Sequence, residues 1–388
     1  MTTSQSGQGS KTSKQPTKRA AKRHTKRLTQ ADDLKNSLSS KAGRVDKSSL
    51  KEAMEFLYKS TGPELISPDP LELVVRYPHP ADQEVAGLLA SSWAYGRVET
   101  IIDHVKTGLS EMGPNPVSFV KHVASSPLHY KDLSVFSDLA HRLHKGGDWA
   151  ALCLFAGELI LEHGSIQQAF ADIWNRCDGN MQGSLGVFAQ KFRDGKYPAR
   201  LSGASTNLRF GETGQLIADA KKGSAAKRLN LWLRWMVRKD SIDPGPWNTD
   251  SIKDFSTKGK HERAPRERGS RARGPLRKDL RELGPSPKDP RERGPRPADL
   301  LLPLDTHTTR LSRYLGFTHR KSPSWKTARE ITDALALFDP DDPVKYDFSL
   351  CRLGILEICP SAGPPENCTP CPIEPWCKRC ESEKQPKK

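Results

Sequence analysis

Apolar residues recur with helical spacing along most of this chain. A helix places positions i, i+3, i+4 and i+7 on one face, whereas a half-buried strand alternates apolar and polar residues. The helical spacing predicts helices at 84–95, 98–112, 150–162, 166–174, 224–238, 306–315, 325–337 and 344–350, and no segment alternates convincingly. The sequence therefore predicts an all-α fold.

The helix predicted at 224–238 is the most informative of these. Its apolar stripe consists of Leu229, Trp232, Leu233 and Met236. A second face carries Lys227, Asn230, Arg234 and Arg238. Such a face is either the solvated side of a helix that is buried on its other side, or a contact surface for an anionic partner.

Two segments of low complexity carry the excess positive charge. The chain has 62 Lys and Arg against 46 Asp and Glu, a formal net charge of +16, and most of it lies in residues 1–50 and 258–298. Neither region has enough large apolar residues to offset the entropy of ordering, so 1–50 and 243–298 are predicted to be disordered. The second, with repeats of the type Arg-Glu-Arg-Gly between prolines, is either a solvated linker or a nucleic-acid-binding arm.

The chain thus divides into five parts. These are a disordered basic tail at 1–50, a helical core at 51–242, a disordered basic insert at 243–298, further helical core at 299–358 and a cysteine-rich tail at 359–388. No apolar run reaches the ~18 residues of a membrane-spanning helix, and no secretory signal is recognisable. We expect a soluble, cytoplasmic protein, nucleoid-associated if bacterial, although the first residues also have a composition found in organelle transit peptides.

The cysteine-rich tail has the spacing of a metal site. Cys359, Cys368, Cys371 and Cys377 follow one another with gaps of 8, 2 and 5 residues, and Cys380 comes shortly after. Four thiolates on a short irregular loop suit a 4Fe-4S cluster. Zinc is the alternative, since Cys368/Cys371 and Cys377/Cys380 form two close pairs, but these pairs lie nearer to each other than in a zinc ribbon. We expect the first four cysteines to be the ligands.

Two motifs resemble the helix-hairpin-helix DNA glycosylases typified by endonuclease III. Leu304-Asp305-Thr306-His307 resembles the stretch that opens a helix with the catalytic aspartate of that family. The cysteine tail resembles the family's cluster loop, with a first gap of 8 residues where the family has six. Asp305 is also a favoured helix N-cap, a role that is compatible with catalysis.

A third motif resembles the hairpin of the same family. In Gly223-Ser224-Ala225-Ala226-Lys227-Arg228-Leu229-Asn230, Lys227 matches the family's catalytic lysine, while Ala225 replaces its second glycine. Lys227 and Asp305 are 78 residues apart, and removal of 243–298 leaves 22, close to the short separation in the family. The insert therefore lies between the two catalytic motifs.

The resemblance extends over three stretches of the chain. Residues 82–95 are similar to the family's first core helix, with Ser92 and Trp93 where the family has a glutamine that fills the gap left by the extruded base. Over 77–96, 223–238 and 302–354 the chain resembles an uncharacterised, mainly bacterial family of conserved hypothetical proteins. We regard that family as a distant branch of the glycosylases.

The resemblance implies an N-glycosylase with AP lyase activity on damaged duplex DNA. Lys227 would be the nucleophile, Asp305 would stabilise the positive charge of the transition state, and His307 would be structural or phosphate-facing. The residues expected to contact DNA are Gly223, Ser224, Arg228, Asn230, Arg234, Ser92 and Trp93. The alternative is a non-catalytic nucleic-acid-binding protein of the same fold, for which RNA would satisfy the same electrostatics. Neither a membrane nor a protein partner is inferred.

Overall fold

The computed structural model of this chain describes residues 18–41, 49–202, 206–248, 294–361, 368 and 371–379, with the side chains of 25–39 in the first range. The described residues are mostly helical, as predicted for an all-α fold. Each stretch predicted to be helical contains a helix. The strands β1 (Ala140–His141) and β2 (His144–Lys145) form a small antiparallel hairpin.

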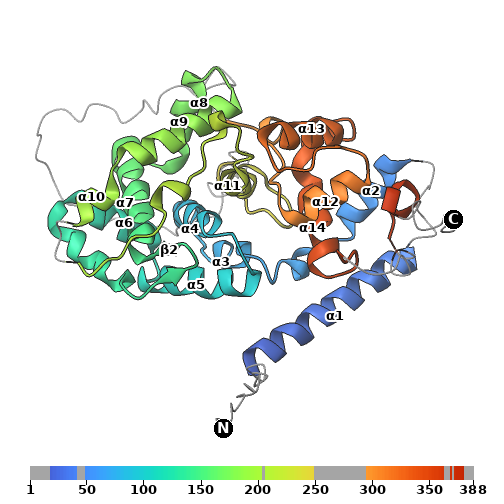
Figure 1. The fold of residues 1–388 in the computed structure, drawn as a ribbon, viewed down its shortest axis with the longest axis horizontal. Helices are drawn as coiled ribbons and strands as arrows, with labels where there is room; N and C mark the ends of the chain where they lie inside the picture. Colours follow the sequence, from blue (N-terminus) through green and yellow to red (C-terminus); the bar gives the residue numbers. More distant parts are fainter. Residues whose placement is uncertain are drawn as a thin grey trace, which may run out of the picture.

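Figure 1 shows two groups of helices with one helix between them. The first group, blue-green to green, is α3 (Leu71–Val74), α4 (Pro80–Ser92), α5 (Val98–Glu111), α6 (Pro116–Ser125), α7 (Gly146–His163), α8 (Ile166–Arg176), α9 (Met181–Asp194) and α10 (Tyr197–Ser202). The second is α12 (Thr306–Tyr314), α13 (Trp325–Ala336) and α14 (Asp347–Ile355), with α2 (Leu50–Lys59) from the start of the chain. Helix α11 (Lys227–Val237) lies between them.

Helix α7 forms the centre of the first group. Nearly all of its residues from Gly146 to Ile160 are buried, and α6 and α8 pack against it. The crossing with α6 is close, because a Cβ at Gly157 would lie 2.1 Å from the carbonyl oxygen of Val120. In the described residues no single helix is long and apolar enough to cross a membrane, and only the bent pair α7 and α8, at 75° to each other, meets that test together.

Helix α11 is buried on several sides. It packs on α4, where Met236 fits against Gly87, and Trp232 lies among the rings of Phe170, Phe188 and Trp247. This burial explains why the apolar stripe of α11 is continuous in the sequence. The packing on α4 places the first turn of α11 next to the end of α4.

The predicted disorder of 1–50 is wrong for residues 18–41, which form α1 (Lys18–Lys41) and project from the body in Figure 1. Ala31, Leu34 and Leu38 are buried, and the amide of Gln30 donates to the carbonyl oxygen of Glu64 at 2.7 Å. A few apolar residues at helical spacing are enough to anchor this helix because they are buried against the rest of the protein. Residues 1–17 and 42–48 lie outside the described residues.

The predicted boundaries of the insert also need correction. Asp243 is fully buried, Trp247 packs against Trp232, and the chain resumes at Gly294 beside Ala171 of α8. Residues 243–248 and 294–298 therefore belong to the folded core. The remainder of the predicted insert, 249–293, lies outside the described residues.

Candidate active site

A cleft of about 830 Å³ opens where α11 meets the second group of helices. Its walls come from α1, from the segment that joins α4 to α5, from α11, and from one side of α12 and of α14. Basic residues line much of it, namely Arg27, Arg97, Lys227, Arg234, Arg310, Arg313 and Lys321. Of these, Arg97, Arg313 and Lys321 are exposed at the rim, so the opening favours an anionic ligand.

Lys227 is the first residue of α11 and lines this cleft half-buried. Its Nζ donates a hydrogen bond to the carbonyl oxygen of Ala94 at 3.2 Å. Within the described part of the chain, Lys227 and Asp305 do not form a direct ion pair. The amine is thus held by a neutral acceptor and faces the same cleft as the aspartate.

Asp305 lines the cleft as the N-cap of α12, the local role that its sequence position predicts. Its Oδ1 accepts the backbone N–H of Thr308 at 2.6 Å, and its Oδ2 accepts the thiol of Cys351 at 2.8 Å. Burial raises the pKa of Asp305, but the charge of Lys227, the thiol and the Thr308 N–H together outweigh it and bring that pKa below its ordinary value. Asp305 is therefore ionised at neutral pH.

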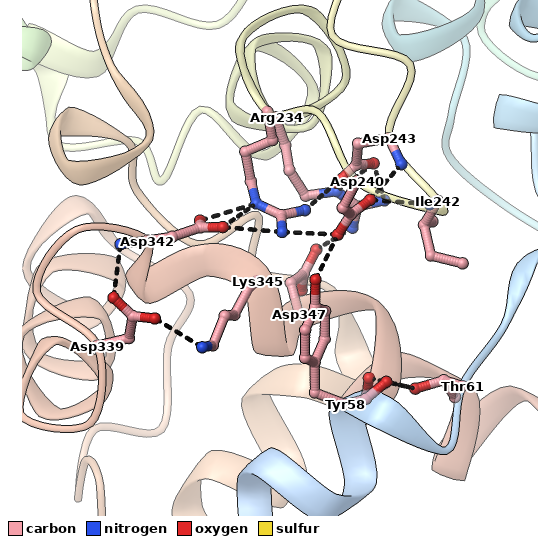
Figure 2. Close-up of polar contacts among 12 residues, drawn as sticks. Tyr58, Thr61, Arg234, Asp240, Ile242, Asp243, Asp339, Asp342, Lys345 and Asp347 are labelled. Carbon is pink, nitrogen blue, oxygen red and sulfur yellow. Dashed lines mark hydrogen bonds and ion pairs between the residues drawn. The ribbon is translucent and has the colours of Figure 1, made fainter.

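A buried ion-pair network forms the floor of the cleft and continues beneath it. Figure 2 shows the cluster: Arg234 pairs with Asp243 and Asp347, and Arg238 links Asp243 to Asp240 and Asp342. Arg234 lies two helical turns after Lys227, on the same face of α11. The ion pair with Asp347 therefore fixes α11 against α14 on the side of the helix that carries Lys227.

Asp347 connects this network to Asp305. The Thr308 hydroxyl donates to its Oδ1 at 3.3 Å, while the Thr308 N–H holds Asp305. Burial raises the pKa of Asp347 to about 6; Arg234 opposes that rise, and the charge of Asp305 adds to it. Two carboxyl groups with pKa values shifted in opposite directions thus share one threonine.

His307 also faces the cleft, on the first turn of α12. Its ring packs on Gly354 of α14, where an added Cβ would lie 2.2 Å from Nδ1, and that nitrogen is buried without a hydrogen-bond partner among the described residues. Burial lowers the pKa of His307. The ring is therefore neutral at neutral pH.

The hairpin motif begins with a turn whose first two residues are accessible. Gly223 is exposed with φ +85°, a left-handed conformation that favours glycine, and Ser224 is half-buried. Ala226 also has a positive φ, +44°, immediately before α11. Arg228 donates to the carbonyl oxygens of Ser92 and Gln215 and lies over the ring of Tyr95.

Four residues that were expected to contact DNA are buried instead. Ser92 and Trp93 are 1% and 0% exposed, and Trp93 stacks on His141. The side-chain amide of Asn230 donates to the carbonyl oxygen of Ala225, and Arg234 is paired with Asp243 and Asp347. Beyond Lys227, the basic face of α11 is thus buried and its arginines are neutralised, because their acidic partners come from segments that the helix pattern does not include.

The structure describes four cysteines of the tail. Burial raises the pKa of Cys371, and Cys359, Cys368 and Cys377 add to that rise. Arg379 donates to the Cys359 sulfur at 3.7 Å. In the described residues no three potential ligand side chains converge closely enough to hold a metal ion as they stand. Cys380 lies outside the described residues.

The cleft therefore combines a lysine amine, an ionised aspartate and a basic rim. Such a set can attack an electrophilic carbon, accept a proton and hold phosphate groups. Sequence analysis identified Lys227 and Asp305 but not Cys351, Asp347 or Thr308. Cys351 and Asp347 carry no local motif, and only the packing of α14 against α12 brings them to the site, where Thr308 already lies on the first turn of α12.

The family described as protein of unknown function (DUF2400) matches residues 69–257 and 293–356. This is more than half of the chain, so the protein belongs to that family. The matched ranges include Lys227 and Asp305 and leave a gap inside the low-complexity segment. Neither the curated proteins nor the solved structures contain a match to this chain.

Proposed function

We propose that this DUF2400 protein is a DNA repair N-glycosylase with AP lyase activity. One observation carries the proposal. Lys227 and Asp305 belong to separate stretches of the sequence on either side of the insert, and they line one cleft in which the lysine charge lowers the pKa of the aspartate. The resemblance to the glycosylase motifs supports the same pair of residues.

The chemistry follows from these two groups. At an abasic site the unprotonated Lys227 amine attacks C1′ of the open-chain sugar aldehyde, water leaves, and a Schiff base joins the enzyme to the DNA. Asp305 is ionised, so its negative charge faces the sugar carbon that the amine attacks. On an intact nucleotide the same carboxylate stabilises the positive charge that develops at C1′ as the base departs.

The exposed basic rim supports an anionic polymer as the substrate. Arg97, Arg313 and Lys321 surround the opening, and contacts of this kind bind the phosphate backbone with a strong dependence on salt. The volume of about 830 Å³ is ample for an extruded nucleotide. RNA would meet the same rim, so the substrate screen includes both nucleic acids.

A 4Fe-4S cluster at the cysteine tail is part of the proposal. The donor set fits in its chemistry, because Cys359, Cys368, Cys371 and Cys377 are soft thiol ligands on one short stretch of chain, and Arg379 donates to the Cys359 sulfur. The cluster would supply structural order to this tail. Zinc is the alternative occupant.

Borohydride trapping tests the proposed activity. The wild-type protein should become covalently attached to an abasic-site duplex when borohydride reduces the Schiff base, and Lys227→Ala should reduce this product by at least about 100-fold because no other amine replaces the nucleophile. The trapped complex is measured on a denaturing gel. Lys222→Ala, an exposed lysine shortly before α11, is the matched control and should trap like the wild type.

A wild-type protein that binds the duplex but never traps would contradict the proposed activity. It would favour the second candidate, a non-catalytic nucleic-acid-binding protein of the same fold. The positive φ of Ala226 and the internal bonds of Arg228 favour that candidate, since both occupy the turn that the family uses on DNA.

Metal analysis after anaerobic purification tests the cofactor. A 4Fe-4S cluster predicts a brown protein with about four irons and four sulfides per chain, and Cys371→Ser should lose them. Cys177→Ser, a half-buried cysteine outside the tail, is the control. A colourless protein that contains zinc and no iron would replace the cluster with the zinc alternative.

A further inference from the structure

We propose that Cys351 is a positioning residue for Asp305, whose thiol hydrogen bond holds the carboxylate and keeps it ionised in the cleft. The proposed reaction gives this bond its importance, but the geometry of the bond is independent of that function. The protonation of Asp305 can also be measured without any substrate.

The bond joins two helices at the cleft. Cys351 lies in α14, four residues after Asp347, and α14 packs against α12, which Asp305 caps. The sulfur is 2.8 Å from Oδ2 of Asp305, while the N–H of Thr308 is 2.6 Å from Oδ1. Each carboxylate oxygen thus has one donor from the protein, and the two donors come from different helices. Together they fix the plane of the carboxylate.

The direction of the hydrogen bond is determined by the protonation states. Burial and the charge of Asp305 raise the pKa of Cys351 well above its ordinary value, so the thiol keeps its proton and acts as donor. The same bond lowers the pKa of Asp305 against the effect of burial. Because an ionised acceptor strengthens a hydrogen bond, even a weak thiol donor contributes here.

The titratable groups that interact with Asp305 are Lys227 on α11, His307 on α12, and Asp347 and Cys351 on α14. Arg27 of α1 and Arg310 of α12 act on His307, and Arg352 of α14 acts on Cys351. His307 is neutral at neutral pH, and Asp347 is paired with Arg234. Lys227 therefore contributes a charge, and Cys351 and Thr308 contribute the direct bonds. Loss of the thiol leaves one bonded oxygen and a carboxylate that binds a proton more readily.

The test measures the protonation of Asp305 directly. Carbodiimide reacts with the protonated carboxyl group. Labelling of Asp305 is measured by peptide mass spectrometry over a series of pH values, and the labelling midpoint is the pH at which half of Asp305 is protonated. Cys351→Ala removes the donor and should move this midpoint up by about one pH unit, a tenfold change in proton affinity. Cys351→Ser keeps a donor and should remain closer to the wild type. Cys351→Val also lacks a donor, preserves the bulk and should behave like the alanine variant.

A second cysteine provides the control for this test. Cys177→Ala removes a thiol at the end of α8 and should leave the Asp305 midpoint unchanged. Equal midpoints for the wild type and for the folded Ala and Val variants would overturn the proposal, since a cysteine that only fills space would give that result. In borohydride trapping, the Cys351→Ala variant should form the covalent complex more slowly than the wild type but bind the duplex with the same affinity. If the wild type does not trap, the proposed activity fails, but the labelling midpoint still decides the role of Cys351.

Discussion

Glu84 is a buried carboxyl group whose environment makes a clear prediction about pH. It is 5% exposed, and its oxygens accept the backbone N–H of Ile166 at 3.0 Å and the Trp247 indole N–H at 2.8 Å. Burial raises the pKa of Glu84 to about 7, although both hydrogen bonds oppose this shift. The folded state therefore binds this proton more tightly than the unfolded chain does.

The sign of the effect on stability follows from that difference. Below the ordinary pKa of glutamate, Glu84 is protonated in both the folded and the unfolded state and does not reduce the free energy of unfolding. As the pH rises toward 7 the unfolded chain loses its proton first, so the free energy of unfolding should fall, by up to about 3 kcal/mol. Urea unfolding between pH 4.5 and 8 measures this. Glu84→Gln cannot ionise and should show a flatter profile than the wild type; parallel profiles would contradict the assignment.

For single residues, the sequence predicts those that carry a local motif and misses those that depend on packing. Asp305 is recognisable from its position before a helix and Lys227 from the hairpin pattern, and both lie at the cleft. Cys351 has no motif and reaches Asp305 only through the packing of α14 on α12. Arg234 was misinterpreted because its partners, Asp243 and Asp347, lie in other segments.

The crossing of α6 and α7 leaves no room for a side chain at Gly157. A Cβ at Gly157 would lie 2.1 Å from the backbone oxygen of Val120, and backbone cannot rotate away as a side chain can. We expect Gly157→Ala to lower the free energy of unfolding by about 1–3 kcal/mol, or more if the helices cannot separate. Denaturant unfolding provides the measurement. Gly214→Ala has open space around its Cβ and should change stability far less; an equal loss in both variants would rule out the steric explanation.

The helices were predictable where one face is continuously apolar. α5, α8, α12 and α13 begin at or close to their expected residues, because burial on one side leaves a clear period in the sequence. α9 was missed, since Gly183 and Gly186 interrupt its pattern, and α1 was missed because its few apolar residues stand among many basic ones. Its order comes from docking, which composition does not reveal.

The whole molecule joins parts that are distant in the chain. α2 packs with α14, near the other end of the sequence, and Arg27 of α1 bonds to Glu99 on one side of the cleft and to the carbonyl oxygen of Ile355 on the other. The sequence predicted two core segments with an insert between them, but not which helices of the two segments are in contact. The contacts among α1, α2 and α14 require tertiary structure.

The folded edges of the insert have a consequence for the connectivity of the protein. The Gln167 side chain contacts the carbonyl oxygen of Trp247, and Gly294 lies against Ala171, so the chain leaves and returns along one face of α8. Lys227 precedes this point and Asp305 follows it, and the buried pair of Arg234 and Asp347 joins the two sides. The described contacts that bring the amine and the carboxylate to one cleft thus come from residues on either side of 249–293. Two separate polypeptides, cut within that range, would keep these described contacts, with half of the site on each.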